Sequence, residues 1–62
     1  MSYTELKKEY VIETIGKGNT VIMCDFSTMR MVDCAEMTVQ AINSFIDKPE
    51  TKFFKVVVNE QA

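Results

Sequence analysis

Apolar and polar residues alternate most clearly in the segment 52–58, near the C-terminus of the chain. Its aromatic and β-branched residues are typical of a strand, in which successive side chains point to opposite faces of a sheet. One face of this strand has Phe54, Val56 and Val58, and the other has Phe53, Lys55 and Val57. The pattern therefore predicts a strand with apolar side chains on both faces.

Just before this strand, apolar residues recur at helical spacing. Asp33, with Glu36 three residues later, is typical of a helix N-terminus, because the aspartate side chain can accept a hydrogen bond from a free backbone N–H. Pro49 disfavours the helical conformation at the residue before it and so ends the helix. The spacing predicts an amphipathic helix from about Cys34 to Asp47, whose apolar face contains Ala35, Val39, Ile42, Phe45 and Ile46.

A glycine-rich break, Gly16-Lys17-Gly18-Asn19, separates two segments rich in β-branched residues, 10–15 and 20–26. Glycine can adopt the positive φ that a tight reversal requires, so a β-hairpin is the natural interpretation. The residues 25–28 are typical of a turn, and a short strand over 29–32 is optional.

A helix is the other interpretation of the N-terminal segment. Ser2 and Glu5 match a capping box, and Tyr3, Leu6 and Tyr10 are spaced as on one face of a helix. A helix over about 3–14 therefore stays open beside the alternative of a helical turn over 4–8 followed by a strand.

Together these elements predict one α+β domain spanning residues 1–62. Its architecture is a small two-layer sandwich, in which an antiparallel sheet of three to four strands packs on one amphipathic helix. The expected order is a β-hairpin, the optional short strand, the helix and the last strand. The last strand should return beside an earlier one, and the centre of the sheet is one place for it.

A single helix covers a single face of a sheet, and we expect it to cover the face with Phe54. The other face would then be apolar as well, with contributions from the segment 20–26 that are either Val21 and Met23 or Ile22 and Phe26. Either an N-terminal helix or another protein chain should cover that face. The candidate interaction face consists of Phe53, Lys55 and Val57.

Composition narrows the possible functions. The chain has 62 residues, a net charge of −2, no histidine and two cysteines, so we expect no metal site and no bound cofactor. Its cations are scattered, which argues against binding to nucleic acid. The longest apolar run has four residues, so we expect no membrane span. The first residues lack the apolar core of a signal peptide, and we expect a cytoplasmic protein.

Cys34 is the candidate reactive thiol, because it would be the first residue of the helix that Asp33 caps. A helix N-terminus lowers the pKa of a thiol, although the neighbouring carboxylate of Asp33 opposes this effect. The ordinary alternative is a small packed side chain. Asp25 and Asp33 are better explained as a turn residue and a helix cap than as a catalytic carboxylate pair.

The segments Val21–Ser27 and Val32–Ala35 resemble the strand-loop-helix core of STAS domains of the anti-sigma-factor-antagonist type. In that family a phosphorylatable serine opens the helix, and Cys34 occupies this position here. Glu36 stands where the family has glycine, and the hydroxyl that accepts the phosphate is absent. The resemblance covers about fifteen residues and implies a regulatory protein that binds other proteins.

By elimination, the expected function is that of a non-enzymatic protein-binding or regulatory module of bacterial or phage type. A chain of this size buries only about 60% of the surface that its unfolded form exposes, so association with itself as a homodimer, or with a protein partner, would add stability. An apolar sheet face or edge would make that contact. The alternative is a thiol-based redox or STAS-like regulatory protein that uses Cys34.

Overall fold

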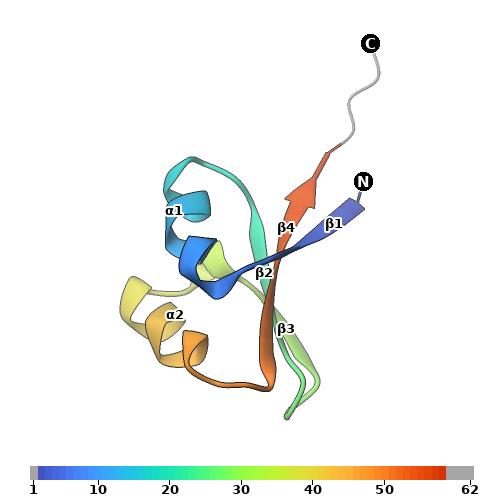
Figure 1. Ribbon diagram of the computed structural model, residues 1–62, viewed down its shortest axis with the longest axis vertical. Helices are drawn as coiled ribbons and strands as arrows, with labels where there is room; N and C mark the ends of the chain where they lie inside the picture. Colours follow the sequence, from blue (N-terminus) through green and yellow to red (C-terminus); the bar gives the residue numbers. More distant parts are fainter. Residues whose placement is uncertain (1, 59–62) are drawn as a thin grey trace.

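The computed structural model describes residues 2–58, and in it four strands form one sheet with two helices against one of its faces (Figure 1). The elements in chain order are β1 (Ser2–Leu6), the short 3-10 helix η1 (Lys8–Tyr10), α1 (Val11–Gly16), β2 (Val21–Asp25), β3 (Arg30–Asp33), the 3-10 helix η2 (Cys34–Glu36), α2 (Val39–Ile46) and β4 (Thr51–Val57).

The sheet has the strand order β1-β4-β2-β3, and every neighbouring pair is antiparallel. The predicted α+β class with an antiparallel sheet is therefore confirmed, as is the return of the last strand to the centre of the sheet. Both central strands, β4 and β2, are rich in β-branched and aromatic residues, which suit a strand with neighbours on both sides. The edges of the sheet are β1 and β3.

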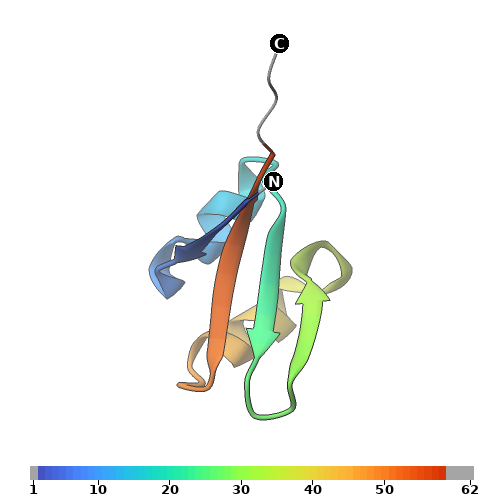
Figure 2. The same cartoon turned by 90° about the vertical axis from the view of Figure 1, so that its right-hand side faces the viewer.

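Both helices lie on the same face because the two crossovers have the same hand. β1–α1–β2 joins two parallel strands with β4 between them, and β3–α2–β4 joins two parallel strands with β2 between them. The second crossover runs across the sheet in the opposite direction to the first, and the strands that it joins also point in the opposite direction. With the usual right-handed sense for both crossovers, the two helices therefore lie on the same side of the sheet. Figure 2 looks at the opposite side, with the strands in front and the helices behind.

The N-terminal segment differs from the predicted hairpin. Residues 10–15 are not a strand: they belong to α1, and the strand lies earlier, in β1. Val11 and Ile15 are four residues apart and both pack into the core, so burial of one helical face outweighs the strand preference of the β-branched residues. Gly18 ends this unit in the left-handed region, at a φ of +88°, which glycine adopts without strain.

The predicted helix over 34–47 is also divided. Asp33 caps only the 3-10 turn η2, where its side chain accepts a hydrogen bond from the N–H of Ala35 at 2.9 Å. Met37 is extended, and a second cap, the hydroxyl of Thr38, accepts from the N–H of Ala41 at 3.1 Å and begins α2. A threonine at this position suits an N-cap, because its backbone is extended while its oxygen binds a free amide of the first turn.

The core lies between the sheet and the helices. Its fully buried apolar residues come from every layer and are Val11, Val21, Met23, Cys34, Ile42 and Phe53. Phe53 is completely buried and lies in the middle strand, between Met23 of β2 and Leu6 of β1. Phe53 is therefore part of the core between the central strands and the helices α1 and α2.

Candidate functional site

The face of the sheet that is turned away from both helices is the candidate functional site (Figure 2). Strand register decides which residues share it, since directly paired residues point to the same side. Tyr3 pairs with Val56, and Phe54 pairs with both Glu5 and Ile22. Cys24 pairs with Lys52 on one side and Met31 on the other. All four strands thus contribute to this face.

The prediction that Phe53, Lys55 and Val57 lie on the face that no helix covers is wrong. These residues are on the side that the helices cover, where Phe53 has no exposed surface and the other two are half-buried. The alternation along β4 was correct, but its assignment to the covered and uncovered faces was inverted. Of the two alternatives for β2, the uncovered face has Ile22, while Val21 and Met23 belong to the core.

A shallow hollow of about 220 Å³ lies on the uncovered face. Residues from all four strands surround it, and their exposed lining is apolar: Tyr3, Ile22, Cys24, Met31 and Phe54. Tyr3 is on one edge strand and Met31 on the other, so the side chains of the two edges enclose the hollow between them. An apolar hollow of this kind suits one or two aliphatic or aromatic side chains of another chain.

The loop of the β2–β3 hairpin, residues 26–29, follows directly after the part of β2 that lines this hollow. Asp25 holds the loop: one carboxylate oxygen accepts hydrogen bonds from the backbone N–H of Ser27 at 3.0 Å and from its hydroxyl at 2.8 Å. The loop ends at Met29, whose φ of +57° lies in the left-handed region. A second, smaller hollow of about 140 Å³ beside the loop shares Cys24 and Met31 with the first.

Large apolar side chains are concentrated around these two hollows. Tyr3 is 57% exposed, Phe26 48%, Met29 79% and Met31 67%, and these are half of the eight large apolar residues exposed within residues 2–58. Aromatic residues have about 150–250 Å² of surface, so Tyr3 and Phe26 alone expose on the order of 200 Å². We call the whole surface the open-face patch, and its members are Tyr3, Ile22, Cys24, Phe26, Met29, Met31 and Phe54.

The face that has the open-face patch has charges of both signs. Glu5 of β1 and Lys52 of β4 point to the same side of the sheet, two residues apart in the strand register, and Asp33 of β3, which pairs with Ile22, points to that side as well. The ammonium of Lys52 lies 6.0 Å from the ring centroid of Phe26, at the outer limit of a cation–π contact. In the described part of the chain, this face therefore has one cation and two carboxylates, and no cluster of like charge.

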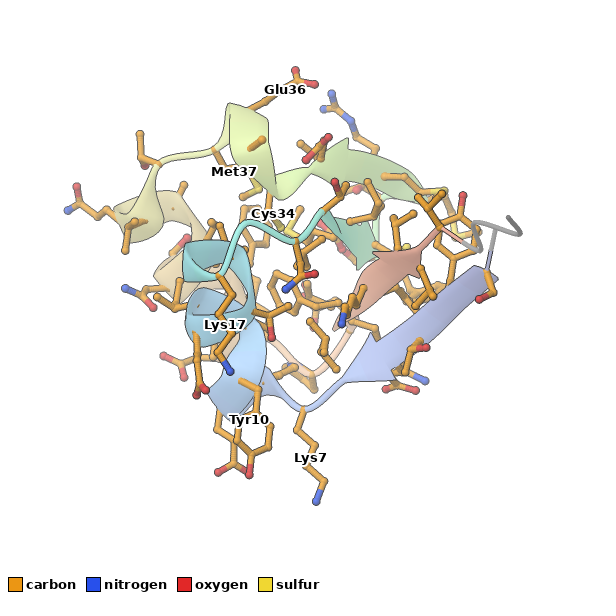
Figure 3. All side chains as sticks on the ribbon, turned by 90° about the horizontal axis from the view of Figure 1, so that it is seen from above. Lys7, Tyr10, Lys17, Cys34, Glu36 and Met37 are labelled. Carbon is orange, nitrogen blue, oxygen red and sulfur yellow. The ribbon has the colours of Figure 1, made fainter. Side chains whose placement is uncertain are left out.

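The thiol of Cys34 is in an environment that opposes reactivity. Cys34 is 2% exposed, and burial, together with the carboxylate of Asp33, raises the pKa of its thiol to about 11. Burial also raises the pKa of the Cys24 thiol. Figure 3 shows Cys34 directed into the interior, whereas Lys7 and Tyr10 point outward. The nucleophile in thiol chemistry is the thiolate, so both cysteines are poor nucleophiles at neutral pH.

The acidic residues considered in the sequence have local structural roles. Asp25 binds Ser27 in the hairpin loop, and the hydroxyl and the N–H of Ser27 lower the pKa of its carboxyl group. Asp33 caps η2 as predicted. Within residues 2–58, no three Cys, Asp or Glu side chains are arranged to hold a metal ion. A broader cleft of about 430 Å³ on the helix side contains Asp25, Arg30 and Lys48 among apolar residues.

Tyr3, Phe26, Met29 and Met31 are the members of the patch that the sequence analysis did not select together. Tyr3 was placed on a helix in one of the two interpretations of the N-terminal segment. The methionines lie in a loop and a four-residue edge strand, where periodicity is too short to assign a face. Two methionines within three residues, Met29 and Met31, were the available indication, since methionine is frequent on adaptable binding surfaces.

Comparisons with known proteins found no matching family model, no matching curated protein and no matching solved structure. The resemblance to STAS domains therefore gains no support from them. In the part of the chain that the structure describes, no helix has the length and apolarity that a membrane span requires.

Proposed function

We propose that this protein is a non-enzymatic interaction module that binds another polypeptide through the open-face patch. The observation that supports this most directly is the concentration of exposed apolar side chains around two adjoining hollows on a sheet face without covering helices. Contiguous exposed apolar surface of more than a few hundred Å² is uncommon on monomers and usually marks a contact with another molecule.

The remaining groups favour binding over chemistry. Both thiols have raised pKa values, and Asp25 and Asp33 are engaged with neighbouring residues. The two cysteines are free, which fits the reducing cytoplasm that we propose as the site of action. Cys34 packs against the core, so a redox role has no supporting geometry.

A pair of matched variants tests the proposal. Met31→Glu places a charge in the open-face patch, whereas Val39→Glu places the same charge on α2, at a residue of similar exposure on the helix side. We expect wild type and Val39→Glu to capture the same protein from cells after in-cell crosslinking, and Met31→Glu to lose it. Capture that is unchanged by Met31→Glu would mean that the open-face patch is not the binding surface.

A further inference from the structure

We infer that the open-face patch binds a second copy of this chain, with the hairpin loop of each copy inserted into the hollow of the other. This inference rests on the proposed function and names the partner. Three observations support it: the shape of the patch, the area of the face and its charge.

The patch contains both parts of a self-complementary contact. The projecting part is the hairpin loop, where Met29 is 79% exposed and Phe26 48%. The receiving part is the hollow of about 220 Å³ next to it, which shares Cys24 and Met31 with the surface of the loop. In an interface with twofold symmetry, each copy must supply what the other requires. A twofold axis between loop and hollow places each loop on the partner's hollow.

The volumes agree with this arrangement. The methionine side chain has four heavy atoms, and at about 30 Å³ each, the share of a water molecule in the liquid, it fills roughly 120 Å³. The hollow of about 220 Å³ therefore accommodates Met29 of the partner and leaves space for part of a second side chain. Methionine is suited to such a role because its unbranched thioether adapts to an irregular surface.

The backbone at Met29 supplies an independent reason to assign a role to this side chain. A φ of +57° is unfavourable for a residue with a Cβ atom, and glycine or asparagine would occupy the position with less strain. Methionine gains nothing there within one copy, because its side chain is 79% exposed. Burial of the Met29 side chain in the partner's hollow stabilises the dimer and so offsets the cost of this backbone strain.

Area and charge also fit a second copy. An interface of standard size buries about 800 Å² of accessible surface on each partner. This is roughly a sixth of the 4550 Å² of accessible surface of this chain. One broad face of a two-layer molecule supplies that share. The face has charges of both signs, Lys52 with Glu5 and Asp33, so each copy can present a cation to a carboxylate of the other.

Sedimentation equilibrium of the wild-type protein at roughly 10–200 µM is the first test, because even weak interfaces of standard size associate at about micromolar concentration. We expect the mass to approach twice the monomer mass of 7.1 kDa. Met29→Gly removes the projecting side chain and relaxes the backbone, so it should weaken association at least tenfold without loss of stability. Val39→Glu, on the helix side, should associate as the wild type does.

A second variant separates shape from apolarity. Cys24→Phe fills the hollow while it adds apolar surface, so it should weaken association if the hollow receives a side chain, and strengthen it if apolar area alone matters. A mixture of the two variants is the decisive measurement. The Cys24→Phe copy still has its Met29, and the Met29→Gly copy still has its hollow. The mixture should therefore form heterodimers more tightly than either variant forms homodimers.

Four results would overturn the inference: a monomeric wild-type protein at the highest concentration, a dimer unaffected by Met29→Gly, stronger association of Cys24→Phe, or no heterodimer in the mixture. None of these decides the proposed function, which the Met31→Glu crosslinking comparison tests separately. A monomer whose captured partner is lost in Met31→Glu would identify the occupant as a different protein.

Discussion

Replacing Phe53 by alanine tests which face of β4 belongs to the core. Phe53 is completely buried among residues of β1, β2 and both helices, so its removal leaves a cavity that the surrounding elements can fill only in part. Phenylalanine-to-alanine changes at such sites cost about 3–5 kcal/mol. A chain of this length has a total stability of about 3–9 kcal/mol, so the variant should be close to unfolded at 25 °C.

The neighbouring Phe54 is the matched control. It has the same side chain in the same strand, but it lies on the uncovered face and is half-buried. Phe54→Ala should therefore cost about 1–1.5 kcal/mol, through loss of half of the burial of one aromatic side chain. Phe53→Leu supplies a milder change at the buried position, about 1.5 kcal/mol, in case the alanine variant does not fold.

Urea denaturation followed by circular dichroism measures these differences as shifts of the midpoint at constant slope. The measurement should be made at two protein concentrations, because self-association through the open-face patch would add a concentration-dependent contribution for Phe54. A cost for Phe54→Ala equal to or greater than that for Phe53→Ala would refute the assignment of the two faces.

Three further changes have defined outcomes. Thr38→Ala removes the cap of α2 and should lower the unfolding free energy by about 1 kcal/mol in urea denaturation, and Thr38→Ser should restore most of it. The Thr51 hydroxyl is buried without a hydrogen-bond partner, so Thr51→Val should raise the thermal midpoint by about 4–8 °C, equivalent to about 1 kcal/mol. A lower midpoint would show that the hydroxyl has a hydrogen-bond partner in the folded protein. Ser27 lowers the pKa of the Asp25 carboxyl in the folded state. The stability that this pair adds is therefore present above about pH 4 and is lost as the pH falls below that value. The difference in unfolding free energy between wild type and Ser27→Ala should therefore shrink below about pH 4, and a constant difference would contradict the pairing.

Some elements were predictable because their determinants are local. The alternation in 52–58 and the apolar run in 20–26 correspond to β4 and β2, and the short strand after the turn is β3. Asp33 was predicted as a cap, and it is one. These assignments depend on backbone preference and on side chains within a few residues, so no distant contact was needed to make them.

The N-terminal segment could not be assigned in the same way. Residues 10–15 have a composition that suits a strand and a spacing that suits a helix, and each preference is worth only a fraction of a kcal/mol per residue. The complete burial of Val11, with Ile15 beside it, is worth more than that difference. Contact with the core therefore decided the conformation of α1.

The sequence by itself determined β2 and β4 and which of their side chains share a face, because the period of two along an extended chain is a property of the backbone. Only the tertiary structure decided which face is covered. That outcome depends on the strand order β1-β4-β2-β3 and on the common hand of the two crossovers, which place α1 and α2 on the same side. Phe53 became core and Phe54 became surface for this reason, although the two residues are adjacent and identical. The open-face patch, made from all four strands and the hairpin loop, exists only after the sheet has formed.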